Sequence, residues 1–101
     1  MTIVGAGGVA IRNVRPLTSF SRQLVDLPRE IREEVRLVLK QLKQDPRPKS
    51  LRFEKLNGHK NPDIYTIHAT SNHNYKISFM IKGDCAILRN IGTHKEIDRA
   101  P

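Results

Sequence analysis

The sequence predicts an α+β domain in which two N-terminal helices pack on a twisted, mainly antiparallel sheet of four to five strands. Three observations predict this class. Apolar residues recur with a helical period through residues 20–42, and they alternate with a strand period through residues 64–70 and 75–81. Gly83-Asp84 then forms a two-residue turn that leads into a further strand. Helices followed by a run of strands are typical of an α+β domain.

The first element is a weak strand. Apolar and polar side chains alternate through residues 9–15, and Pro16 is expected to end the strand because proline cannot donate to a ladder. Thr18 or Ser19 then caps a short helix. Its apolar side chains recur at positions i, i+4 and i+7: Phe20, Leu24 and Leu27.

A second, longer helix follows. Pro28 stands at its first helical position, and Asp45-Pro46 ends it because a residue before proline avoids the α region. One face is apolar: Ile31, Val35, Val38, Leu39 and Leu42. The other face carries basic and acidic residues, so this helix is amphipathic and packs by its apolar stripe.

The rest of the chain predicts strands at residues 51–55, 64–70 and 75–82, and a last strand after the Gly83-Asp84 turn. If these strands pair as a meander, one sheet face is polar: Thr66, His68, Lys76 and Ser78. The opposite face covers the helices. The expected core consists of Phe20, Leu24, Val35, Val38, Leu42, Tyr65, Ile67, Ile77, Phe79 and Ile87.

Composition limits the domain organisation and the class of partner. At 101 residues we expect one domain at residues 9–101 behind a flexible leader at residues 1–8. The net charge of +8 favours a polyanion or an acidic protein as partner. The single Cys85 excludes an intrachain disulfide and suits a reducing cytoplasm. No apolar run is long enough for a membrane span, and no ligand spacing indicates a metal site or another cofactor.

Several segments in this order resemble the RelE/ParE superfamily of bacterial toxins from type II toxin–antitoxin pairs. They are Leu27-Pro28-Arg29-Glu30-Ile31, Asp45-Pro46, Lys55-Leu56-Asn57-Gly58, Tyr65-Thr66-Ile67-His68, Tyr75-Lys76-Ile77, Gly83-Asp84 and Gly92-Thr93-His94-Lys95-Glu96. The resemblance covers nearly the whole chain. It implies the fold predicted above and a cognate acidic antitoxin as partner.

The resemblance leaves two functions open. RelE-like members cut messenger RNA on the ribosome without a metal ion, whereas ParE-like members inhibit DNA gyrase and are not known as nucleases. By motif, His94 corresponds to a catalytic histidine or arginine of the nucleases, and His68 lies where they often carry a basic residue. Lys76 replaces the arginine of a usual Tyr-Arg pair, and Asp98 stands where an aromatic residue is usual.

Metal-free RNA cleavage needs a base for the ribose 2′-OH, an acid for the leaving 5′-oxygen and cations for the phosphorane charge. We therefore predict an endoribonuclease with His94, His68 and Lys76 as the catalytic residues. The expected RNA-binding residues are Arg89, Lys49, Arg52, Lys55 and Lys95, with Lys60 on the same basic rim. His59 and His73 lie in turns and are interpreted as ordinary loop residues. The alternative is a non-enzymatic inhibitor of DNA gyrase.

Overall fold

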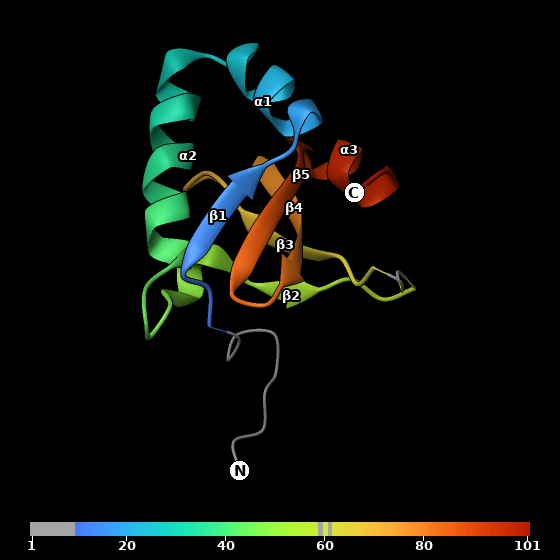
Figure 1. The fold of residues 1–101 in the computed structure, drawn as a ribbon. Helices are drawn as coiled ribbons and strands as arrows, with labels where there is room; N and C mark the ends of the chain where they lie inside the picture. The colour runs from blue at the N-terminus through green and yellow to red at the C-terminus, as the bar shows by residue number, and fades with distance from the viewer. Residues whose placement is uncertain (1–9, 59, 61) are drawn as a thin grey trace.

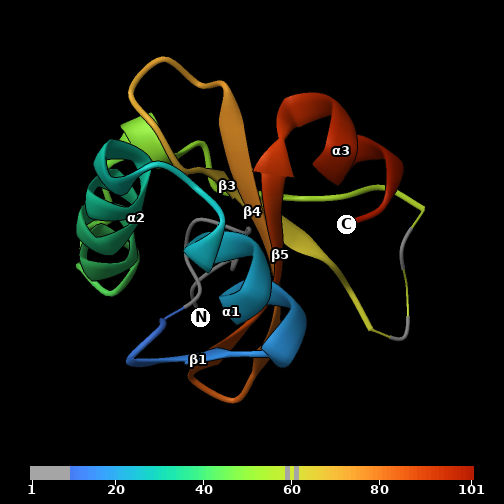
Figure 2. The same cartoon turned by 90° about the horizontal axis from the view of Figure 1, so that it is seen from above.

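The computed structural model describes residues 10–58, 60 and 62–101, so the expected leader at residues 1–8 and His59 lie outside the described part. A five-stranded sheet forms the middle of the domain. Helices α1 and α2 precede most of the sheet in the chain, and a third helix, α3, follows it (Figure 1). Seen from above, α2 and α3 lie on opposite sides of the sheet (Figure 2). The predicted α+β class is confirmed.

The sheet has the strand order β1-β5-β4-β3-β2. The strands are β1 (Asn13–Pro16), β2 (Glu54–Lys55), β3 (Tyr65–His68), β4 (Tyr75–Lys82) and β5 (Cys85–Thr93). Strand β1 runs parallel to β5, and the other neighbours are antiparallel. Gly83 has a φ of 64°, as the expected turn between β4 and β5 requires.

The helices are α1 (Thr18–Val25), α2 (Arg29–Leu42) and α3 (His94–Arg99), with a short 3-10 helix at Lys49–Leu51. The cap predicted for α1 is wrong. Leu17 is the N-cap residue, and it makes no side-chain cap hydrogen bond. The Ser19 hydroxyl instead donates to the Arg89 carbonyl at 2.6 Å, which fastens α1 to β5.

Three predicted strands have different bounds in the structure, and the one expected at residues 64–70 spans Tyr65–His68. Strand β1 includes Pro16, which was expected to end it. Because β1 is the edge strand, a missing N–H on its outer side costs no ladder hydrogen bond. The strand expected at residues 51–55 is reduced to Glu54–Lys55, since Leu51 belongs to the 3-10 helix.

The core lies between the sheet and helices α1 and α2. The alternation predicted for β3 and β4 is confirmed: Ile67, Ile77 and Phe79 are buried in the core. Ile87 is only partly buried and lies outside the core cluster, so that assignment is wrong. A register shift at Ser78/Phe79 pairs Phe79 with Leu88, and the inward residues of β5 are Ala86, Leu88 and Ile91.

Helix α3 was not predicted, and its N-terminus is held by a capping box. The Thr93 hydroxyl accepts from the Glu96 backbone N–H, and the Glu96 carboxylate accepts from the Thr93 N–H at 2.8 Å. A Cβ built on Gly92 would lie 2.9 Å from a Glu96 carboxylate oxygen, so glycine lets the side chain of Glu96 approach the strand. The Gly92-Thr93-His94 motif therefore positions the first turn of α3.

Thr93→Ala is expected to lower the free energy of unfolding by about 1 kcal/mol, because it removes the cap of α3. Urea denaturation of the variant measures the change. Lys95→Ala, on the same exposed turn, serves as the control. If both variants unfolded at the wild-type urea concentration, the capping box would not stabilise α3.

Candidate active site

The polar face of the sheet and the first turns of α3 form the candidate site. In the sheet register, His68 on β3 pairs with Lys76 on β4, and Lys76 pairs with Gly92 on β5. Strand β5 then continues directly into His94, the first residue of α3. The predicted polar face is confirmed, and it brings the three predicted catalytic residues together.

Asp98 joins two of these residues. One carboxylate oxygen accepts from the Lys76 Nζ at 2.9 Å, and the other lies 3.0 Å from the His94 Nδ1. His94 and Asp98 are four residues apart on α3, a spacing that places them on one helix face. The hydrogen bond from Lys76 lowers the pKa of Asp98, and the His94 contact adds to this effect. Asp98 is therefore ionised at neutral pH.

Lys76 lies on the predicted polar face of the sheet, but its side chain is buried there. Its side chain is 4% exposed and lies between Asp98 and Glu54, whose carboxylate is 3.9 Å away. A buried ammonium requires such partners because an unpaired charge is costly away from water. The positive charge of Lys76 is thus directed at carboxylates of the same chain.

Three histidines cluster beside this ion pair. The His68 ring packs edge-on against His73, with centroids 4.5 Å apart, and against His94 at 5.5 Å. The Nδ1 atoms of His68 and His73 are in hydrogen-bond contact. His73, which has a φ of 60°, is therefore part of the cluster and not an ordinary loop residue.

His68 is neutral at neutral pH. Burial and, after it, the charges of His73, Lys76, His94 and Arg52 together lower its pKa to about 4. A neutral imidazole can donate one hydrogen bond and accept another. It does not supply the permanent positive charge of an imidazolium.

The lowered pKa of His68 predicts a pH dependence of stability. Between pH 6.5 and about 4, His68 is protonated in the unfolded chain but not in the folded chain. The free energy of unfolding therefore falls as the pH falls through this window. Urea unfolding at several pH values should show a shallower slope for His68→Gln than for the wild type. An NMR titration of His68 with a midpoint near 6.5 would contradict this account.

Two of the predicted RNA-binding residues, Arg52 and Lys95, lie near the histidine cluster. Arg52 lies near enough to His68 to affect its pKa, and Lys95 follows His94 on α3 with an exposed side chain. Lys55 instead forms an ion pair with Asp63 at 3.2 Å.

Arg89 and Lys49 lie elsewhere. The Arg89 Nε donates to the Pro101 carbonyl at 3.3 Å, and Lys49 lines a cavity beyond the end of α2. Lys60, on the expected rim, is exposed.

The geometry suits proton transfer at His94. When Asp98 accepts from the His94 Nδ1–H, the lone pair of the neutral ring is on Nε2. The carboxylate also stabilises the ring after it gains a proton. The side chain of His94 is 48% exposed, so a substrate can reach it.

Sequence reasoning missed Asp98 and His73. The spacing of His94 and Asp98 on a helix would have indicated their contact, whereas no sequence signal places the His73 loop.

Within residues 10–58, 60 and 62–101, no group of three or more His, Cys, Asp or Glu side chains is arranged to hold a metal ion. The described helices are all too short or too polar to cross a membrane.

Solved structures share this fold. A chain of the archaeal RelE–RelB complex from Pyrococcus horikoshii matches with a TM-score of 0.63 and 15% identity, over 80% of this chain and 92% of that chain. A chain of the RelB–RelE antitoxin–toxin complex from Methanococcus jannaschii has a TM-score of 0.61 and 27% identity, over 86% and 99%. YafQ from Escherichia coli has a TM-score of 0.65 and 13% identity, over 85% and 97%. No protein-family model and no curated protein matches the sequence.

Proposed function

This chain has the fold of the RelE/ParE superfamily of toxins, and we propose that it is the toxin of a type II toxin–antitoxin pair that cuts messenger RNA without a metal ion. One observation carries the proposal. Asp98 contacts the Nδ1 of a half-exposed His94, which adjoins the neutral His68. A carboxylate, an oriented imidazole and an adjoining histidine are suited to acid–base chemistry.

In the proposed reaction, the His94 Nε2 takes the proton of a ribose 2′-OH. The 2′-oxygen forms a bond to the neighbouring phosphorus, and the bond from phosphorus to the 5′-oxygen breaks. The His94 imidazolium returns the proton to the leaving 5′-oxygen. The products are a 2′,3′-cyclic phosphate and a 5′-hydroxyl.

The neighbouring residues support this step in different ways. His68 donates a hydrogen bond from its neutral ring to the reacting phosphate or hydroxyl. Arg52 and Lys95, which flank the histidines, attract the phosphate backbone. Lys76 acts through Asp98: it holds the carboxylate that orients His94 and does not itself bind phosphate.

The proposed partner is an acidic antitoxin. Two of the similar structures are RelE–RelB complexes, and the net charge of +8 favours an acidic chain. The clearest support would be a short neighbouring gene that encodes an acidic protein and suppresses the toxicity of this one.

The test is induced expression followed by mapping of RNA 5′ ends, together with a gyrase supercoiling assay on the purified protein. We expect new RNA ends in translated messages and unaffected supercoiling. Intact transcripts together with blocked supercoiling would overturn the nuclease and support the ParE-like inhibitor of gyrase.

A further inference from the structure

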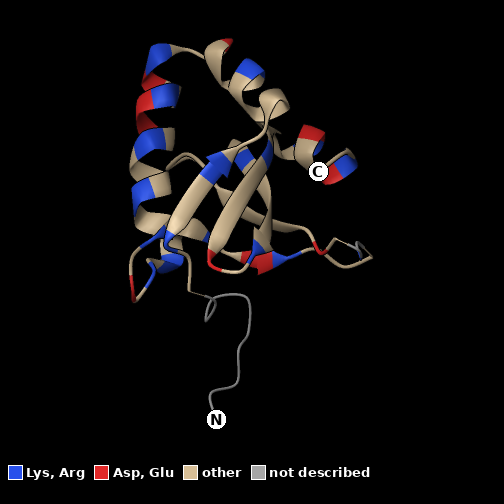
Figure 3. Cartoon of the chain, in the orientation of Figure 1, with Lys and Arg blue, Asp and Glu red and all other residues tan. Residues whose placement is uncertain are grey.

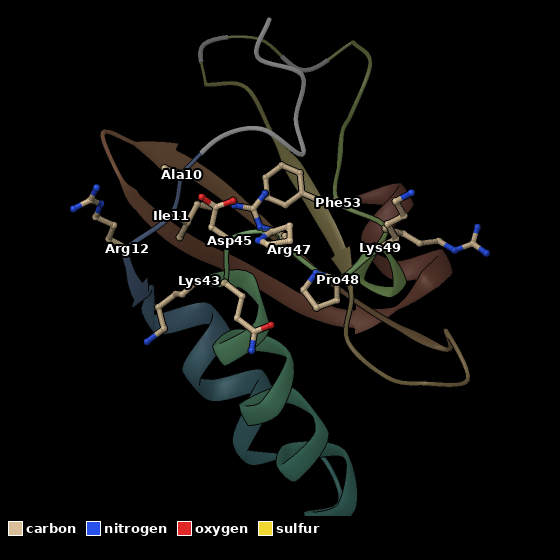
Figure 4. A pocket seen from close by; sticks show the side chains of 12 residues that line it. Ala10, Ile11, Arg12, Lys43, Asp45, Arg47, Pro48, Lys49 and Phe53 are labelled. Atoms are coloured by element: carbon tan, nitrogen blue, oxygen red, sulfur yellow. The ribbon is translucent and has the colours of Figure 1, made fainter. Parts of the chain in front are cut away.

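A cavity of about 570 Å³ lies beyond the C-terminal end of α2 (Figure 4). Of its lining residues, the reaction proposed above uses Arg52 alone. Five basic residues and one carboxylate line it: Arg12, Lys43, Arg47, Lys49, Arg52 and Asp45. Basic residues are concentrated at this end of the molecule, whereas α2 itself carries both signs (Figure 3). The cavity is therefore suited to an anion.

Arg47 is a fixed, planar group in this cavity. Its Nε donates to the Leu42 carbonyl at 2.9 Å, and its guanidinium carbon lies 4.4 Å from the centre of the Phe53 ring. Phe53 is held in turn by an edge contact with Phe79, at 5.4 Å between centroids. Burial lowers the pKa of Arg47, although the nearby Asp45 opposes this shift. A guanidinium that already stacks on an aromatic ring is a platform for a nucleobase.

The other basic residues surround this platform. The side chains of Arg12, Lys43 and Lys49 extend from the edge of the cavity in different directions (Figure 4). In the described part of the chain, neither they nor Arg52 form an ion pair with a carboxylate. Their charges are available to phosphates that pass over the cavity.

We propose that this cavity binds one nucleotide of single-stranded RNA, with the base on Arg47 and the flanking phosphates among the rim cations. The volume is within the usual range of small-ligand sites. Arg52 lines the cavity and also acts on the pKa of His68, so it links the cavity to the histidine cluster. An RNA strand bound at His94 thus has a basic path to a second contact. The choice of RNA as ligand rests on the proposed function.

Fluorescence anisotropy with a labelled 2′-O-methyl RNA oligonucleotide tests the proposal, because this probe lacks the 2′-OH and cannot be cut. Lys43→Glu should weaken binding several-fold and lower the slope of log K against log salt concentration by about 1. Lys40→Glu, which makes the same charge change one turn earlier on α2 and outside the cavity, should bind within about twofold of the wild type. Equal affinities of the two variants would contradict the proposal that RNA binds in this cavity.

Arg47→Lys tests whether a nucleobase stacks on the Arg47 guanidinium, because lysine keeps the positive charge but lacks the planar group. It should lower the affinity for the oligonucleotide about fivefold or more, but should not lower it for an abasic oligonucleotide. Equal losses for both probes would overturn the stacking. If Arg47→Lys does not fold, the wild-type protein is measured with the abasic and the complete oligonucleotide. Equal affinities for the two probes would likewise contradict stacking on Arg47.

The proposal can fail separately from the proposed function. A protein that cuts RNA, but whose Lys43→Glu and Lys40→Glu variants bind alike, would contradict the cavity alone. A protein that cuts no RNA, but loses binding in Lys43→Glu, would contradict the nuclease and support the cavity.

Discussion

His94→Ala is expected to slow RNA cleavage by about 10²–10⁴-fold, because it removes the group that we propose to take and return the proton. The side chain is half exposed and lies at the start of α3, so the fold and the binding of an antitoxin should persist. Single-turnover cleavage of a defined RNA by the purified variant measures the effect.

Arg99→Ala is the matched control, because it changes an exposed residue of the same helix. It should cut at nearly the wild-type rate. A His94→Ala protein that is folded and cuts as fast as the wild type would exclude His94 as the acid–base residue.

Phe79→Ala should lower the free energy of unfolding by about 3–5 kcal/mol, because it leaves a cavity in the core. Phe79 has 0% of its surface exposed, and its ring contacts Phe53 and Tyr65 with centroids 5.4 Å and 5.9 Å away. It also lies at the register shift between β4 and β5. Urea denaturation of both proteins measures the loss.

Leu37→Ala serves as the comparison for Phe79→Ala, since Leu37 is 56% exposed on α2. We expect a change within about 0.5 kcal/mol, as for most surface substitutions. If the two variants had equal stability, the face assigned to β4 would be wrong.

The strand faces could be predicted because side chains alternate strictly in a regular strand. His68 and Lys76 share a face for this reason, and so do Ile67 and Ile77 on the other side. The prediction from alternation was wrong at Ile87, because a register shift at Ser78/Phe79 interrupts the pairing of β4 with β5. Nothing in the local sequence marks that shift, which depends on how β4 and β5 pair in three dimensions.

The third helix was missed although its signal is present. Thr93 and Glu96 have the spacing of a capping box, but α3 is six residues long and has little periodicity of its own. Without the helix, Asp98 could be interpreted only as a replacement for an aromatic residue. Its contacts with His94 and Lys76 follow from the helix and from the packing of α3 on the sheet.

The site also contains groups that a sequence cannot place. His73 reaches His68 through a loop with a positive φ, and such loop geometry has no readable pattern in the chain. Lys76 looks like an ordinary strand lysine in sequence, and its burial results from two carboxylates on other elements. Proton-transfer candidates could thus be named from sequence, but their electrostatic partners could not.

The chemical nature of the new RNA ends tests the central claim most directly. Purified protein is incubated with messenger RNA and translating ribosomes, and the labelled products are analysed by enzymatic end-group assays. The account predicts 2′,3′-cyclic phosphate and 5′-hydroxyl ends in the wild type and their loss in His94→Ala. Products with 3′-hydroxyl and 5′-phosphate ends, or RNA that remains intact, would contradict it.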